Sequence, residues 1–86
     1  MKLLKFEAPW CTKCTQMTNI LETMDLPFPV VKVNIDSDRD TAMTYGIRGL
    51  PHMILMDEND NIVTRIGGVA TKEQIAEAFG LNESNT

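Results

Sequence analysis

Two cysteines lie three positions apart in the stretch Phe6-Glu7-Ala8-Pro9-Trp10-Cys11-Thr12-Lys13-Cys14. On the first turn of a helix such a pair can close a small disulfide ring, and the unpaired backbone N–H groups there stabilise a thiolate. These are the only cysteines among the 86 residues, so they cannot be half of a larger disulfide framework or complete a cysteine-built zinc site. The stretch therefore predicts dithiol–disulfide chemistry.

Length and charge limit the remaining choices. A chain of 86 residues forms one small domain with a modest core. The formal net charge is −4, and the lysines and arginines are spread along the sequence, so we expect protein partners, no nucleic acid and no membrane. The first residues do not resemble a signal peptide and no stretch approaches membrane-spanning length. We expect a cytoplasmic monomer.

Hydrophobic periodicity predicts alternating strands and helices in the first half of the chain. A strand at residues 3–7 leads into a helix at residues 12–24 with the apolar stripe Met17, Ile20, Leu21 and Met24. After a proline-containing breaker, residues 30–35 form a second strand. A right-handed crossover makes the two strands parallel.

The second half predicts a short helix, a hairpin and a final helix. Asp36 or Ser37 caps the short helix, which runs through Ala42, Met43 and Tyr45. An irregular loop at residues 46–51 precedes strands at 52–56 and 62–66, which pair in antiparallel fashion around a polar turn.

The end of the chain has clear helix signals. Gly67-Gly68 ends the last strand, and Thr71 with Gln74 forms a capping box. The final helix is expected to bury Ile75, Ala78 and Phe79 and to end at Gly80. Residues 1–81 thus form one domain, and residues 82–86 are expected to be a frayed polar C-terminal tail.

Four motifs occur in the order and with the spacings of the thioredoxin family. They are the cysteine stretch, Val33-Asn34-Ile35-Asp36, Tyr45-Gly46-Ile47-Arg48-Gly49-Leu50-Pro51 and Ile66-Gly67. The chain resembles a short, minimal thioredoxin that begins at the strand before the active site. This resemblance implies an α/β fold with a four-stranded mixed sheet in the order 2-1-3-4 and three helices. The first and last helices should lie on one face and the middle helix on the other.

The resemblance also implies the site. Cys11, expected to be the more exposed cysteine, would attack a substrate disulfide, and Cys14 would resolve the mixed disulfide. Leu50-Pro51 matches the family's cis proline, where the backbone would pair with an extended substrate segment. The implied substrate-binding residues are Trp10, Thr12, Lys13, Gly49, Leu50, Pro51 and Gly67. An ordinary turn explains Gly67-Gly68 equally well. No cofactor is expected beyond the redox-active disulfide.

Two charged residues depart from the family pattern. Lys5 stands where the family usually has a buried aspartate, and Glu7 replaces an aromatic residue on the same side of the strand. We expect an ion pair between them, because an unpaired charge in a central strand is costly. Lys32 matches a family lysine, and the three residues together would favour the thiolates and raise the reduction potential. Alternatively, Lys5 snorkels to solvent.

His52 has two interpretations. It either titrates near the site or is a half-exposed strand histidine.

The leading hypothesis is a thiol–disulfide oxidoreductase that reduces protein disulfides and takes part in electron transport. A thioredoxin-reductase-like enzyme or a small dithiol would recharge it. Three alternatives stay open. They are a glutaredoxin-like oxidoreductase, a non-enzymatic module that clamps a partner protein, and a metal or iron–sulfur carrier that uses the cysteine pair across a dimer.

Overall fold

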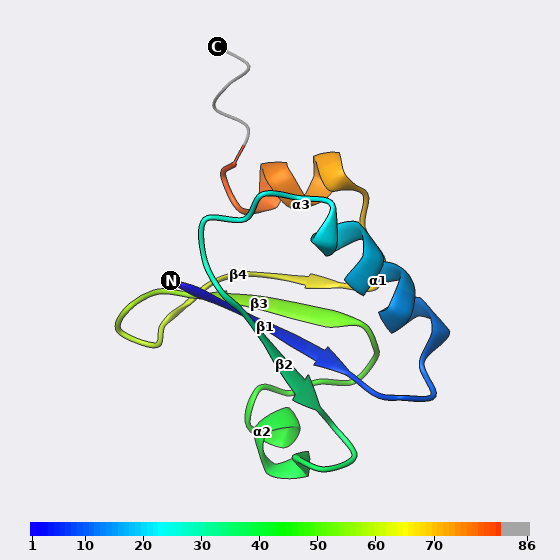
Figure 1. The fold of residues 1–86 in the computed structure, drawn as a ribbon. Helices are drawn as coiled ribbons and strands as arrows, with labels where there is room; N and C mark the ends of the chain where they lie inside the picture. The colour runs from blue at the N-terminus through cyan, green and yellow to red at the C-terminus, as the bar shows by residue number, and fades with distance from the viewer. Residues whose placement is uncertain (82–86) are drawn as a thin grey trace.

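The computed structural model describes residues 1–81, and the predicted tail at residues 82–86 lies outside this range. Strands and helices alternate along the described chain as the sequence predicts (Figure 1). Their bounds are β1 (Lys2–Glu7), α1 (Thr12–Glu22), β2 (Val30–Asn34), α2 (Arg39–Thr44), β3 (His52–Met56), β4 (Ile62–Gly67) and α3 (Lys72–Ala78). Within residues 1–81, no helix is long and apolar enough to cross a membrane.

The sheet has the order β2-β1-β3-β4, which confirms the predicted topology. β1 is parallel to β2 and antiparallel to β3, and β3 and β4 form the expected antiparallel hairpin. Helices α1 and α3 lie on one face and α2 on the other, also as predicted (Figure 1). The chain segment that carries the cysteines therefore follows directly from a central strand.

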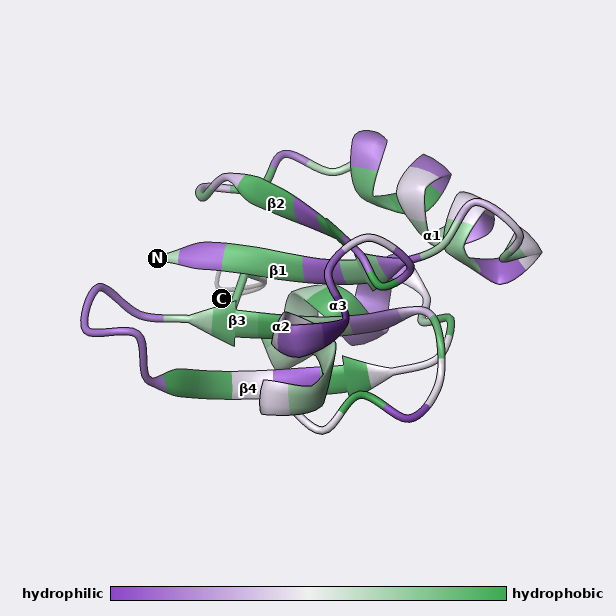
Figure 2. Ribbon diagram, turned by 90° about the horizontal axis from the view of Figure 1, so that it is seen from below, coloured by the Kyte–Doolittle hydropathy of each residue, from purple (hydrophilic) through white to green (hydrophobic). Residues whose placement is uncertain are grey.

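Alternation along the central strands divides the core between the two faces. Leu3, Met53 and Leu55 pack against α1 and α3, whereas Leu4 and Ile54 face α2. Hydrophobic residues accordingly fill most of β3, whereas in β1 they alternate with hydrophilic residues (Figure 2). The predicted stripe of α1 lies in the first cluster, with Met17 and Leu21 buried and Ile20 and Met24 partly buried.

Helix ends differ from the predictions at two places. α1 ends at Glu22 rather than residue 24. The Thr23 and Met24 N–H groups each donate to the carbonyl three residues back, so the chain tightens there instead of continuing the α-helix. α2 is capped by Asp38, not by Asp36 or Ser37. The Asp38 carboxylate accepts a hydrogen bond from the Thr41 N–H at 3.3 Å.

The capping box of Thr71 and Gln74 is confirmed, and Gly80 follows α3 with a φ of 70°. Ala78 was expected to be buried, and it is exposed. Ile75 and Phe79, four positions apart, form the narrow stripe by which this short helix contacts the core. A helix of seven residues makes only about two turns, so few of its side chains can face the core.

Candidate active site

Cys11 is the N-cap residue of α1. Its backbone is extended, with φ −95° and ψ 103°, and its Sγ accepts a hydrogen bond from the Cys14 N–H at 3.1 Å. Its own N–H donates to the Ala8 carbonyl at 3.1 Å, so the turn that leaves β1 fixes where the helix begins. The sulfur therefore lies at the positive end of the helix dipole, where a thiolate is stabilised.

Cys11 and Cys14 form a disulfide with their Cα atoms 5.2 Å apart. That separation is normal for a disulfide. Cys11 is 9% exposed and Cys14 is 3% exposed, so Cys11 is the more accessible of the two, although both are largely covered. Ala8 is the buried neighbour of the pair, and Ile35 and Leu50 pack against it.

Trp10 stands beside the disulfide and is 66% exposed. Its indole Nε1 donates a hydrogen bond to Asp36 Oδ2 at 3.0 Å, which ties the cysteine loop to the segment after β2. Asp36 is expected from the sequence as a possible helix cap and as part of a family motif, but its contact with Trp10 is not predicted. The family motif that contains Asp36 could have indicated this contact, but Trp10, the hydrogen-bond donor, lies 26 residues earlier in the chain.

A hollow of about 320 Å³ opens next to Cys11. Three of the predicted substrate-binding residues line it with the cysteine, namely Trp10, Gly49 and Leu50. The Leu50-Pro51 peptide bond is cis, as the resemblance implied, and the Pro51 carbonyl accepts a hydrogen bond from the Gly68 N–H at 2.8 Å. This contact holds the proline loop against the end of β4.

The other predicted substrate-binding residues lie around this hollow rather than in its lining. Thr12 and Lys13 are exposed on the first turn of α1, and Pro51 is buried. Gly67 lines a neighbouring groove. Gly68 has a φ of 84°, which a residue with a side chain rarely adopts, so a turn alone accounts for a glycine there.

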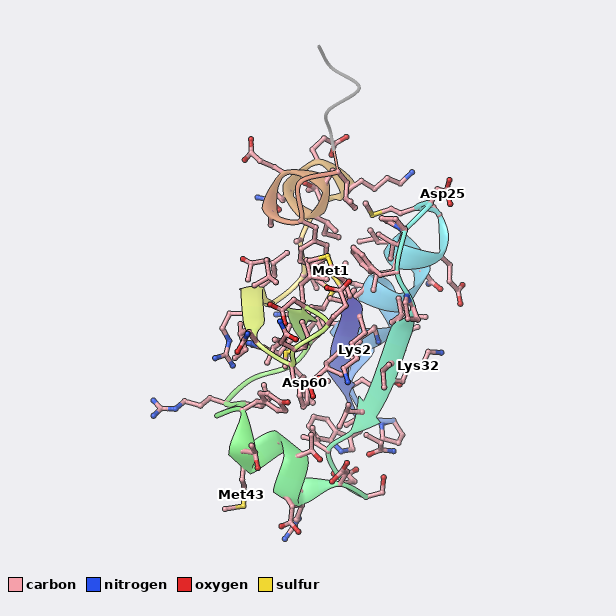
Figure 3. All side chains as sticks on the ribbon, turned by 90° about the vertical axis from the view of Figure 1, so that its left-hand side faces the viewer. Met1, Lys2, Asp25, Lys32, Met43 and Asp60 are labelled. Carbon is pink, nitrogen blue, oxygen red and sulfur yellow. A yellow bond between two sulfur atoms is a disulfide. The ribbon has the colours of Figure 1, made fainter. Side chains whose placement is uncertain are left out.

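Lys5 is buried, and its ammonium forms an ion pair with Glu7. The Lys5 side chain is 1% exposed, which rules out snorkelling, while that of Glu7 is 25% exposed. Lys32 is exposed on the edge strand β2, and within residues 1–81 it joins no ion pair (Figure 3). Lys32 lies next to Lys5 in the β1–β2 register and lines the same hollow, but among residues 1–81 only Lys5 forms an ion pair with Glu7.

Glu7 and Cys14 line the same cavity of about 190 Å³ beneath the start of α1. Lys5 lines a separate hollow on the other side of Thr18, which borders both. Glu7, rather than Lys5, thus lines the same cavity as the second cysteine. A carboxylate near Cys14 disfavours the Cys14 thiolate, because the two negative charges repel each other.

His52 is half-buried on β3 and accepts a hydrogen bond from Arg65 Nε at 3.0 Å. Burial, and secondly the Arg65 charge, lower the pKa of His52 from its ordinary value. This matches the interpretation as a half-exposed strand histidine. The contact with Arg65 joins residues from two strands and was not anticipated.

Comparison with known proteins agrees with this geometry. Residues 1–80 match the sequence model of the thioredoxin family. The chain belongs to the thioredoxin family. It is 31% identical to the thioredoxin of Haemophilus influenzae over 78 residues, which cover 86% of this chain and 72% of that protein. It is 38% identical to the thioredoxin of Chlamydia pneumoniae over 74 residues, which cover 83% and 72% respectively.

Solved structures support the fold of this family member. A mutant thioredoxin from Halobacterium salinarum superposes with a TM-score of 0.82 at 25% identity, covering 95% of this chain and 74% of that one. Thioredoxin 1 from Thermosipho africanus gives 0.82 at 16% identity, covering 100% of both chains. Together with the Cys11–Cys14 disulfide at the helix start, family membership identifies a dithiol thiol–disulfide oxidoreductase.

Proposed function

We propose that this thioredoxin-family protein reduces protein disulfides, with Cys11 as the attacking thiolate and Cys14 as the resolving one. The observation that carries the assignment is the N-cap position of Cys11, where the Cys14 N–H donates to its sulfur. A negative charge on that sulfur strengthens the hydrogen bond and interacts favourably with the helix dipole. Cys14, one turn further along, lacks the capping position.

The exchange takes two steps. The Cys11 thiolate bonds to one sulfur of the substrate disulfide, whose S–S bond breaks, and the other substrate sulfur leaves as a thiolate and is protonated. The Cys14 thiolate then attacks the Cys11 sulfur and releases the second substrate thiolate. Two electrons and two protons pass to the substrate, and the protein is left with the Cys11–Cys14 disulfide.

The hollow beside Cys11 suits an extended segment of the substrate. Trp10, Gly49 and Leu50 line it, and backbone groups of the proline loop can pair with a strand-like chain. We assign Thr12, Lys13, Pro51 and Gly67 to the surroundings of that segment. Recognition through backbone groups would allow many sequences to bind.

Turnover needs an external source of electrons. We assign this to a thioredoxin-reductase-like enzyme or a small dithiol, which places the protein in electron transport without a resident cofactor or metal. Dithiols persist in a reducing compartment, which favours a cytoplasmic location. We further propose that the protein acts as a monomer.

Lys5 and Glu7 tune the second cysteine in this proposal. Glu7 shares a cavity with Cys14, and its ionised carboxylate would oppose a thiolate there. Lys5 offsets that charge because its buried ammonium is paired with the same carboxylate. Lys32 contributes little, since solvent screens an exposed charge.

Trapping of mixed disulfides tests the assignment of the cysteines. Cys14→Ser should accumulate a covalent adduct between Cys11 and a disulfide substrate, because attack remains possible and resolution does not. Cys11→Ser, which also removes a single thiol, is the matched control and should trap far less. Equal trapping by the two variants, or more by Cys11→Ser, would overturn the assignment.

A further inference from the structure

One groove beside the site is lined by two of the eight Lys and Arg residues of this chain. It has a volume of about 500 Å³ and is lined by Tyr45, Gly46, Arg48, Gly49, Leu50, His52, Arg65, Gly67 and Gly68. These include two of the three arginines in the sequence and its one histidine. Among the residues that the structure describes, no Asp or Glu lines the groove. The residues that line the groove therefore carry net positive charge, on a protein of formal net charge −4.

Arg65 is held in a defined position in this basic groove. Its Nη2 donates to the Tyr45 carbonyl at 2.6 Å, and its Nε donates to His52 Nε2 at 3.0 Å. Because burial and Arg65 itself lower the pKa of His52, the imidazole stays uncharged near neutral pH and can accept this bond. A guanidinium has five N–H donors, so further donors remain for a ligand.

Arg48 supplies the second charge and connects the basic groove to the disulfide. Its side chain is exposed and forms no ion pair with any residue in the range 1–81. Arg48, Gly49 and Leu50 line both this groove and the hollow that contains Cys11. The two depressions thus meet along one loop, and an extended chain at Cys11 can continue into the basic groove.

We propose that the basic groove binds an acidic segment of the substrate protein, next to the disulfide that Cys11 attacks. Carboxylates match the paired N–H donors of arginine in geometry as well as charge. The net charge of −4 repels acidic partners at a distance, and the arginines reverse that repulsion close to the reacting sulfur. This specificity rests on the proposed reduction of protein disulfides.

Two synthetic peptide disulfides of equal length test the inference, one with glutamates beside the reactive cysteine and one with glutamines. The second-order rate constant for reduction by the dithiol form is measured at low and high ionic strength. We expect the glutamate peptide to react about two- to fivefold faster at low salt, the size of one or two exposed ion pairs. The preference should shrink at about 1 M salt, where charges are screened within a few ångströms.

Arginine variants assign the preference to the groove. Arg48→Gln should remove much of it, and Arg48→Gln with Arg65→Gln should abolish it. Arg39→Gln is the matched control, because it removes the same charge from the start of α2, outside the groove, and should leave the preference intact. Arg48→Gln alone carries the test if loss of the Arg65 contacts impairs folding.

The outcomes separate the two proposals. If the protein reduces both peptides at equal rates, or if Arg39→Gln lowers the preference as much as Arg48→Gln does, the groove does not select acidic segments. If the protein reduces neither peptide, the proposed reduction of protein disulfides is wrong, and so is the preference for acidic segments that rests on it.

Discussion

Removal of either partner of the Lys5–Glu7 pair should have unequal effects on stability. Glu7→Gln leaves the Lys5 ammonium, whose side chain is 1% exposed, without a counter-ion. Breaking a buried ion pair in this way costs about 3–5 kcal/mol. A domain of 86 residues has a total stability of about 4–13 kcal/mol, so this loss is a large fraction of it.

Lys5→Met should be milder. It keeps the aliphatic stem and leaves the Glu7 carboxylate, whose side chain is 25% exposed and borders a cavity, so water can solvate it in part. We expect a loss of about 1–3 kcal/mol. The double variant, Lys5→Met with Glu7→Gln, removes both charges and should be more stable than Glu7→Gln alone, because no buried charge is left unpaired.

Urea denaturation of the oxidised protein measures these three losses, with the wild type as reference. The double variant is the internal control, since it differs from Glu7→Gln only at Lys5. Two results would contradict this order of stabilities: a smaller loss for Glu7→Gln than for Lys5→Met, or losses that simply add in the double variant. Either result would mean that the ammonium finds solvent or another partner once Glu7 is removed.

Three further predictions concern the potential, the pH dependence and the last helix. Lys5→Asp and Lys5→Met should both lower the reduction potential, the aspartate variant by more. Equilibration against a glutathione redox buffer measures the potential of each variant. Unchanged potentials would show that Lys5 does not influence the reduction potential. Since the pKa of His52 is lowered in the folded state, the unfolded state binds more protons as pH falls below about 6.5. Stability should drop from about pH 7 to pH 5, and drop less in His52→Gln, whereas equal slopes in the two proteins would contradict the shift. Thr71→Ala removes the capping box of α3 and should cost about 1 kcal/mol in thermal or urea unfolding, and no loss would contradict that role.

The sequence predicts the sheet and its layers well, because period-two alternation and turn residues act locally. β1, the β3–β4 hairpin and the capping box of Thr71 follow from neighbouring residues alone. The parallel pairing of β2 follows from the handedness of the crossover. The cis bond before Pro51 depended instead on the family resemblance, since local sequence alone favours a trans bond.

What the sequence did not predict depends on contacts between distant segments. Periodicity places Lys5 beside Glu7 but does not reveal that Lys5 is buried, or that Glu7 and Cys14 line one cavity. The contact from Trp10 to Asp36 bridges two loops. The basic groove escaped notice because its arginines are separated in the sequence and gather only when the proline loop lies against β4.

Trapping with Cys14→Ser and Cys11→Ser addresses the order of attack, whereas the transfer of electrons to a protein disulfide is measured directly by counting thiols. The dithiol form is mixed without oxygen with a protein disulfide, and mass spectrometry counts thiols and disulfides on both partners after quenching. We expect one new Cys11–Cys14 disulfide for each substrate disulfide reduced. If the substrate stays oxidised while both cysteines remain thiols, the protein does not reduce protein disulfides.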